Sequence, residues 1–87
     1  MITPSQIRMA RAALSWSVRE LAKRAGVAAN TVSRFENGSG AMVDTLGRMQ
    51  DALERAGIVF ISADQAGGPG VRLREVPASK AKRKRSR

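Results

Sequence analysis

Residues 21–38 have the sequence LAKRAGVAANTVSRFENG, and they carry most of the structural information in the chain. Helix-compatible segments flank Gly26, a residue that adopts the left-handed backbone conformation without steric cost. Ala22 is small enough to let two helices approach each other closely at such a bend. The segment therefore predicts two short helices joined by a tight turn.

Four apolar side chains of this segment have a spacing that directs them into one shared core: Leu21, Val27, Val32 and Phe35. Burying them leaves the opposite side of the second helix facing solvent. A single helix with a free polar side fits a DNA major groove, which is about 12 Å wide. We therefore expect a helix-turn-helix unit whose recognition helix lies near residues 29–37.

The flanking sequence predicts further helices on both sides of this unit. A first helix begins near Thr3 or Ser5, either of which can cap it, with Pro4 in its first turn. Ser17 caps the following helix, and Glu20 three residues later completes a capping box. Downstream of the turn, the helical pattern extends over about residues 28–37.

A fourth helix is expected over about residues 43–56, because apolar residues recur there at helical spacing and Gly57 ends the pattern. Its apolar face comprises Val43, Leu46, Met49, Ala52 and Leu53. Met9, Met42 and Met49 are interpreted as core-filling side chains. Trp16 is interpreted as a packing residue rather than a base-stacking one.

The pattern then changes to a β-hairpin. Residues 58–61 are β-branched and aromatic, residues 71–74 alternate apolar with basic, and a glycine-rich loop at 66–70 separates them. One apolar face comprises Ile58, Phe60, Val71 and Leu73, and the other carries Val59 and Ile61. Because an isolated hairpin is marginal in water, these faces need cover from helix four or from a second copy. We expect the first face at or near a homodimer interface.

The amino-acid composition excludes several classes of function. The 87 residues include no cysteine and no histidine, which removes thiolate and imidazole metal ligands and the usual nucleophile–base pairs. We therefore expect no metal, no cofactor, no small-molecule substrate and no enzymatic activity. No apolar run reaches the roughly 18 residues of a membrane span, and no signal peptide is recognisable. Neither a membrane association nor export is expected, so we expect a cytoplasmic protein.

The net charge of +9 indicates a polyanionic partner. Residues 76–87 contain six of the sixteen basic residues and no acid, so they are expected to form a basic tail, disordered when free, that adds phosphate contacts. The expected organisation is a DNA-binding domain at 1–57, a hairpin at 58–75 that serves dimerisation, and the tail at 76–87.

Over residues 5–57 the chain resembles the phage repressor and Cro family of helix-turn-helix regulators, also called the xenobiotic-response-element-like (XRE) family. The resemblance rests on the order Leu-Ala, Gly-Val, Val-Ser and Glu-Asn-Gly within residues 21–38, followed by Thr45-Leu46. It implies a mainly α fold, a lambda-repressor-like bundle of four helices, here followed by the β-hairpin and the basic tail.

The resemblance also implies roles for individual residues. Base-reading positions of the family correspond to Ala29, Asn30, Ser33 and Arg34. Reasoning from the helix period selects the same side, because Asn30, Ser33 and Arg34 are spaced i, i+3, i+4 away from the apolar positions. Asn30 can pair with adenine and Arg34 with guanine, whereas Ala29 offers a methyl group suited to thymine.

Phosphate contacts are expected from residues around the recognition helix: Arg11, Ser17, Arg19, Lys23, Asn37, and the backbone of Ser39 and Gly40. In the family, a basic residue late in helix one pairs with the acid that closes helix three, and Arg11 and Glu36 occupy these places. An ordinary surface ion pair is the alternative interpretation. The sequence departs from the family pattern at Ala28, where a capping Ser or Thr is common, and at Val18, where a polar residue is usual.

These features together predict a sequence-specific regulator of transcription that binds double-stranded DNA. We expect a repressor that binds an inverted repeat as a homodimer, with two recognition helices about 34 Å apart. One alternative is a DNA-binding antitoxin that neutralises a partner toxin, with the hairpin or tail as the binding surface. A third is an accessory factor of a phage or mobile element that uses DNA binding for recombination.

Overall fold

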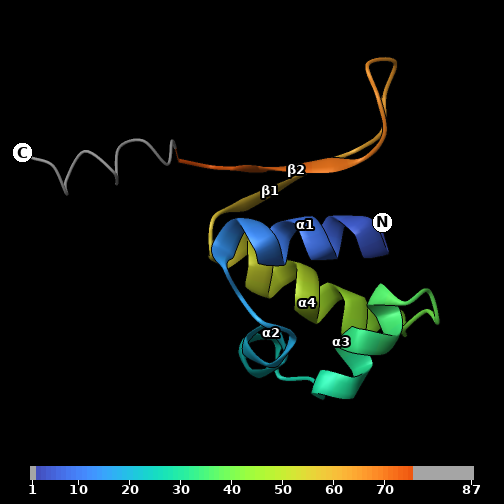
Figure 1. Cartoon of the computed structure of the whole chain (residues 1–87), viewed down its shortest axis with the longest axis vertical. Coiled ribbons are helices and arrows are strands. Elements are labelled where there is room, and N and C mark those ends of the chain that lie inside the picture. Colours follow the sequence, from blue (N-terminus) through green and yellow to red (C-terminus); the bar gives the residue numbers. More distant parts are fainter. Residues whose placement is uncertain (1, 76–87) are drawn as a thin grey trace, which may run out of the picture.

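The computed structural model describes residues 2–75, in which four helices precede a two-stranded antiparallel sheet. The helices are α1 (Pro4–Leu14), α2 (Val18–Ala25), α3 (Ala29–Glu36) and α4 (Val43–Arg55), and the strands are β1 (Ile58–Ile61) and β2 (Gly70–Leu73). Figure 1 shows the hairpin at one end of the molecule and the α2–α3 pair at the other. The predicted mainly helical fold with a C-terminal hairpin is confirmed. The predicted basic tail at 76–87 lies outside the described residues.

Local sequence signals set the boundaries of α1. Thr3, one of the two predicted caps, accepts a hydrogen bond from the Gln6 amide, and the Gln6 side chain accepts one from the Thr3 amide. This is a complete capping box that was not predicted from the sequence. The helix ends at Leu14, and the C-cap residue Ser15, in the left-handed conformation (φ 57°), donates its amide to the Ala12 carbonyl.

The core lies between the four helices, and the hairpin covers it on the side of α1 and α4. The largest side chains that are fully buried come from all four helices and from β1: Ile7, Leu21, Val32, Met49, Leu53 and Ile58. Phe35 is also buried, whereas Val27 packs against the core from its edge. The predicted apolar anchors of the helix-turn-helix therefore all contact one shared core.

The start of α4 differs from its prediction. Met42 and Val43, predicted as core residues, are 76% and 71% exposed, and Met9 is also exposed. Met42 is the N-cap residue and Val43 is the first residue of the helix, so both come before Leu46, the first residue of α4 that is buried in the core. The prediction is correct for Met49, which is fully buried.

The hairpin has the register that puts its four predicted face residues together. Ile58 is opposite Leu73 and Phe60 is opposite Val71. Ile58 is 1% exposed, and the other three residues pack partly buried against the helical core. The contacts of β2 with α1 and of β1 with α4 mean that the cover required by this face comes from the same chain. On the opposite face, Val59 remains 39% exposed.

A buried glutamine ties the hairpin to the helices. The Gln6 side chain is 3% exposed, and its Nε2 donates to the Ile61 carbonyl at 3.0 Å and to the Gly70 carbonyl at 2.9 Å. These two residues face each other in the register and close the paired part of the hairpin. One side chain of α1 therefore holds both strands.

Among the residues that the structure describes, no helix has the length and apolar character that a membrane span requires.

Candidate nucleic-acid interface

The bend between α2 and α3 forms as predicted at Gly26. Gly26 has a φ of 71°, in the left-handed region, and its amide bonds to the Ala22 carbonyl. The Val27 amide donates to the same carbonyl at 3.0 Å. These two bonds satisfy the end of α2 and turn the chain so that α3 begins at Ala29. Ala28 is the N-cap residue and supplies no side-chain cap, as its identity predicts.

α3 presents two different sides. Val32 and Phe35 are buried, whereas Asn30 and Arg34, one turn apart, are exposed. Of the other two predicted base-reading residues, Ala29 and Ser33 are half-buried. The structure thus brings all four onto one short helix, with the two longest polar side chains facing solvent.

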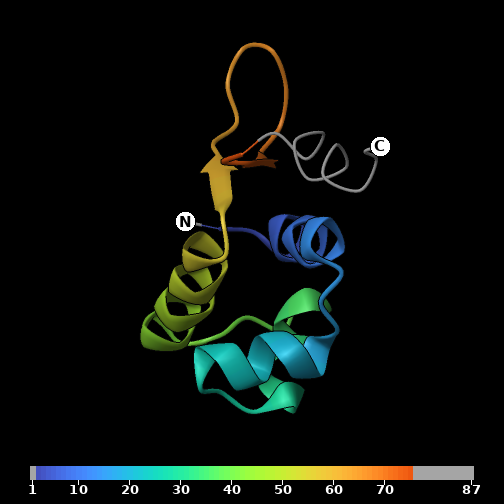
Figure 2. The same cartoon turned by 90° about the vertical axis from the view of Figure 1, so that its left-hand side faces the viewer.

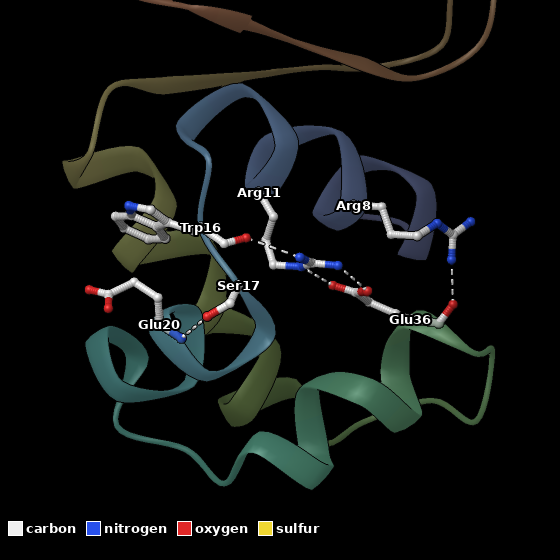
Figure 3. Close-up of polar contacts among 6 residues, drawn as sticks. All are labelled: Arg8, Arg11, Trp16, Ser17, Glu20 and Glu36. Atoms are coloured by element: carbon white, nitrogen blue, oxygen red, sulfur yellow. Dashed lines mark hydrogen bonds and ion pairs between the residues drawn. The ribbon is translucent and has the colours of Figure 1, made fainter.

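The predicted Arg11–Glu36 contact is present, and it is a two-pronged ion pair (Figure 3). Arg11 Nε lies 2.7 Å from Glu36 Oε2, and Nη2 lies 2.8 Å from Oε1. The Glu36 side chain is 8% exposed and that of Arg11 is 20% exposed, so this is not an ordinary surface pair. The hydrogen bonds to Glu36 raise the pKa of the Arg11 guanidinium. Arg11 Nη1 also donates to the Trp16 carbonyl at 3.0 Å, which joins α1, the α1–α2 turn and α3.

A second arginine of α1 holds the same end of α3. Arg8 Nη1 donates to the Glu36 backbone carbonyl at 2.5 Å, and Nη2 lies 3.4 Å from Ser5 Oγ. A cation at the C-terminus of a helix also complements the helix dipole. This role of Arg8 was not predicted from the sequence, although its position one turn before Arg11 on α1 was an available signal.

The start of α2 carries a cap and an aromatic contact. Ser17 Oγ accepts from the Glu20 amide at 3.0 Å, which confirms the predicted cap. The capping box is not completed, because the Glu20 carboxylate accepts from Arg24 Nε at 2.6 Å instead. This hydrogen bond lowers the pKa of Glu20. The Arg24 guanidinium lies 4.7 Å from the centre of the Trp16 ring, a cation–π contact that fixes the half-buried indole against α2.

Three exposed cations of α2 and α3 make no ion pair within the described part of the chain: Arg19, Lys23 and Arg34. Two of them, Arg19 and Lys23, are predicted phosphate-binding residues. Charged side chains that form no ion pair remain available to an anion. These cations therefore give the helix-turn-helix end of the molecule an uncompensated positive charge.

The loop after α3 offers fewer donors than predicted. The Asn37 amide donates to the Ser33 carbonyl, and the Ser39 amide donates to the Arg34 carbonyl at 2.9 Å. The backbone amide of Ser39, a predicted phosphate contact, is therefore already hydrogen-bonded within the chain. The side chains of Asn37 and Ser39 are exposed, and the Gly40 amide makes no bond to another described backbone carbonyl. These three groups can still approach a phosphate.

The four predicted dimer residues lie away from this site. Ile58, Phe60, Val71 and Leu73 belong to the hairpin, at the opposite end of the molecule from α3 (Figure 1). A hairpin contact between two copies would therefore not involve the surface that carries Asn30 and Arg34.

Comparison with known proteins agrees with this geometry. A family model described as helix-turn-helix matches residues 7–56, from the body of α1 to the end of α4. A search of curated proteins found no match. The matched segment covers more than half of the chain and contains the whole α2–α3 unit. The chain belongs to the XRE-like helix-turn-helix family of DNA-binding regulators.

Proposed function

We propose that this protein is a sequence-specific transcriptional regulator that inserts α3 into the major groove of double-stranded DNA. The observation that carries the proposal is the two-sided character of α3, with Asn30 and Arg34 exposed while Val32 and Phe35 are buried. A helix fixed to its core by one side presents the other in a constant orientation, which direct readout of bases requires.

The proposed base contacts follow from the chemistry of each side chain. Arg34 suits guanine O6 and N7, and Asn30 suits adenine N6 and N7. Ala29 contacts a thymine methyl group, and Ser33 donates to either a base or a phosphate. Because Ala29 and Ser33 are half-buried, they approach the DNA less closely than the two longer side chains.

Phosphate contacts on both sides of α3 would position it in the groove. Arg19 and Lys23 reach one strand from α2, and Ser17 adds a hydroxyl at its N-terminus. On the other side, the Asn37 and Ser39 side chains and the Gly40 amide reach the second strand. Arg11 serves mainly to hold Glu36, with its exposed edge near a phosphate.

We further propose that the regulator is a repressor that occludes a promoter by binding an inverted repeat as a homodimer. A single helix-turn-helix contacts few base pairs, so a second copy on an adjacent half-site multiplies specificity. The two-fold symmetry of a dimer would match the symmetry of such an operator.

Selection of bound duplexes from a random library with the full chain tests the proposal. We expect a shared half-site, present as an inverted repeat. On that DNA, Arg34→Ala should weaken binding by about 1–3 kcal/mol and relax the preference at one base pair. Arg72→Ala is the matched control, because it removes the same charge from the exposed face of β2. Equal loss of discrimination in both variants, or no selected sequence at all, would contradict the proposal.

A second candidate is an antitoxin that uses the same DNA-binding unit but neutralises a protein toxin. The exposed Val59 on the outer side of the hairpin is the observation that favours it, since this apolar side chain remains 39% exposed within the described residues. A toxin partner would be recovered in a stoichiometric complex from the native source, and Val59→Lys should release it without affecting DNA binding.

A further inference from the structure

The outer face of α4 has a composition that the fold of a single copy does not explain. Its centre consists of Asp44, Gly47, Arg48, Asp51 and Arg55, all exposed, and we refer to these five residues as the α4 stripe; the exposed Val43 and Glu54 of the same helix lie beside it. The buried side of the same helix carries Leu46, Met49, Ala52 and Leu53. The stripe is therefore the side of α4 that points directly away from the core.

Gly47 is the first unusual feature of the stripe. Glycine is, after proline, the residue least favourable to a helix interior. Nothing lies within 4 Å of the position where its side chain would begin, and its φ is not in the left-handed region. Neither internal packing nor backbone conformation thus requires glycine here. A close approach from outside the chain would require it.

The charges of the stripe are the second feature. Along the helix they alternate as acid, base, acid and base, and within the chain Asp44 pairs with Arg48 at 3.4 Å and Asp51 with Arg55. In the described part of the chain, the basic residues that form no ion pair all lie outside the stripe: Arg8, Arg19, Lys23, Arg34, Arg72 and Arg74. Two copies of a chain with a net charge of +9 repel each other, and the stripe is a surface on which that repulsion is locally cancelled.

We propose that two copies of the protein associate through their α4 stripes, with the helices antiparallel about a two-fold axis. The spacing is self-complementary: when Asp44 is opposite Arg55 of the second copy, Arg48 is opposite Asp51 of the second copy. Symmetry then repeats both pairs, so eight charges form one neutral network. Gly47 lies directly before the central Arg48–Asp51 pairs, close to the two-fold axis near which the two backbones approach each other.

This arrangement rests on the proposed function and places the recognition helices correctly for it. In Figure 2, α4 forms one flank of the molecule while α2 and α3 form its lower end. A vertical axis along that flank leaves both α2–α3 ends on the same side, where one DNA duplex can contact them. In Figure 1, α4 slopes across the view, so a copy related by this axis runs largely, although obliquely, in the opposite direction.

The contact should be weak without DNA. One exposed helix face buries less than the roughly 800 Å² per partner of a stable complex, and its ion pairs are solvent-exposed. Two adjacent half-sites raise the effective concentration of one copy for the other. We therefore expect slight self-association in solution, sensitive to salt, and cooperative binding to an inverted repeat.

A charge exchange tests the interface in the full chain by sedimentation equilibrium without DNA. Arg48→Glu and Asp51→Arg each place like charges opposite each other twice, and each should lower the self-association constant by about tenfold. An equimolar mixture of the two variants should regain wild-type association, because the carboxylate introduced in one variant then faces the guanidinium introduced in the other. Arg72→Glu has the same charge change as Arg48→Glu and should associate at least as well as wild type.

General charge effects predict a different outcome. Arg48→Glu lowers the net charge and Asp51→Arg raises it, so a nonspecific mechanism would move them in opposite directions. Unchanged association in both variants, or a mixture no better than either variant alone, would overturn the proposal. Thermal unfolding of each variant would show that the fold is retained.

A second variant separates the interface from folding. Gly47→Gln should raise the thermal stability of the single chain, since glutamine favours helix, yet it should lower self-association by filling the close approach. Cooperativity on a selected inverted repeat should fall while affinity for one half-site stays unchanged. A stabler variant with undiminished association would contradict the role of Gly47. If the protein self-associates as expected but shows no preference for any DNA sequence, the interface is supported and the proposed regulator function is refuted.

Discussion

Arg11 of α1 and Glu36 at the end of α3 form a two-pronged ion pair in which the carboxylate is almost completely buried. Glu36 is the last residue of the recognition helix, and α1 packs on the core through Ile7 and Ala10. The pair therefore fixes the end of α3 to a helix that lies outside the proposed base-reading surface.

Arg11→Met should destabilise the protein by about 2–3 kcal/mol, because it leaves the buried carboxylate without its cation. Urea unfolding monitored by Trp16 fluorescence measures the change. Arg48→Met breaks an exposed pair and should cost below about 1 kcal/mol. Equal effects of the two substitutions would mean that Glu36 is solvated rather than held by Arg11.

Arg8→Met should loosen the end of α3 without unfolding the protein. It removes the donor to the Glu36 carbonyl, a contribution of about 1 kcal/mol, and a cation at the helix C-terminus. Hydrogen exchange should accelerate at the amides of residues 37–39, next to the proposed phosphate contacts. Arg8→Lys keeps the charge and should show a smaller acceleration. Unaltered exchange in Arg8→Met would show that Arg11 alone holds this end.

The sequence predicted the two sides of α3 because a helix repeats every 3.6 residues, so the positions of Val32 and Phe35 determine where Asn30 and Arg34 point. It predicted the Gly26 bend because few residues adopt a positive φ without cost. Both inferences use interactions between residues close together in the chain, together with a family pattern that records their arrangement.

The contacts that the sequence did not reveal join residues far apart in the chain. Gln6 bonds to carbonyls 55 and 64 residues away, and Arg8 to one 28 residues away. Every residue has a backbone carbonyl, so the sequence does not indicate which carbonyl accepts a hydrogen bond from a side chain. The sequence also did not reveal that Val43 is exposed. Its position fits the helical spacing of apolar residues, but it lies at the start of α4, before the residues that contact the core.

Gln6→Leu should separate the hairpin from the helices. Leucine fills a similar volume but cannot donate to the Ile61 and Gly70 carbonyls, so we expect a loss of about 2–3 kcal/mol. Amides of the two strands should lose their protection from hydrogen exchange more than those of α2 and α3. Gln65→Leu, on the exposed hairpin loop, is the matched control and should have little effect. A uniform loss of protection throughout the chain would show that hairpin and helices unfold as one unit.

Removal of residues 76–87 should weaken binding to every DNA sequence by a similar factor. The segment contributes six basic residues and no acid, and each phosphate that it neutralises adds about 0.9 to the slope of log affinity against log salt. Titrations of the full and shortened chains with selected and random duplexes, over a range of salt, measure both effects. We expect a shallower slope and an unchanged ratio of specific to nonspecific affinity, because the proposed base contacts come from α3. If the ratio collapsed while the slope stayed constant, the segment would be contacting bases, and the assignment of specificity to Asn30 and Arg34 would have to be revised.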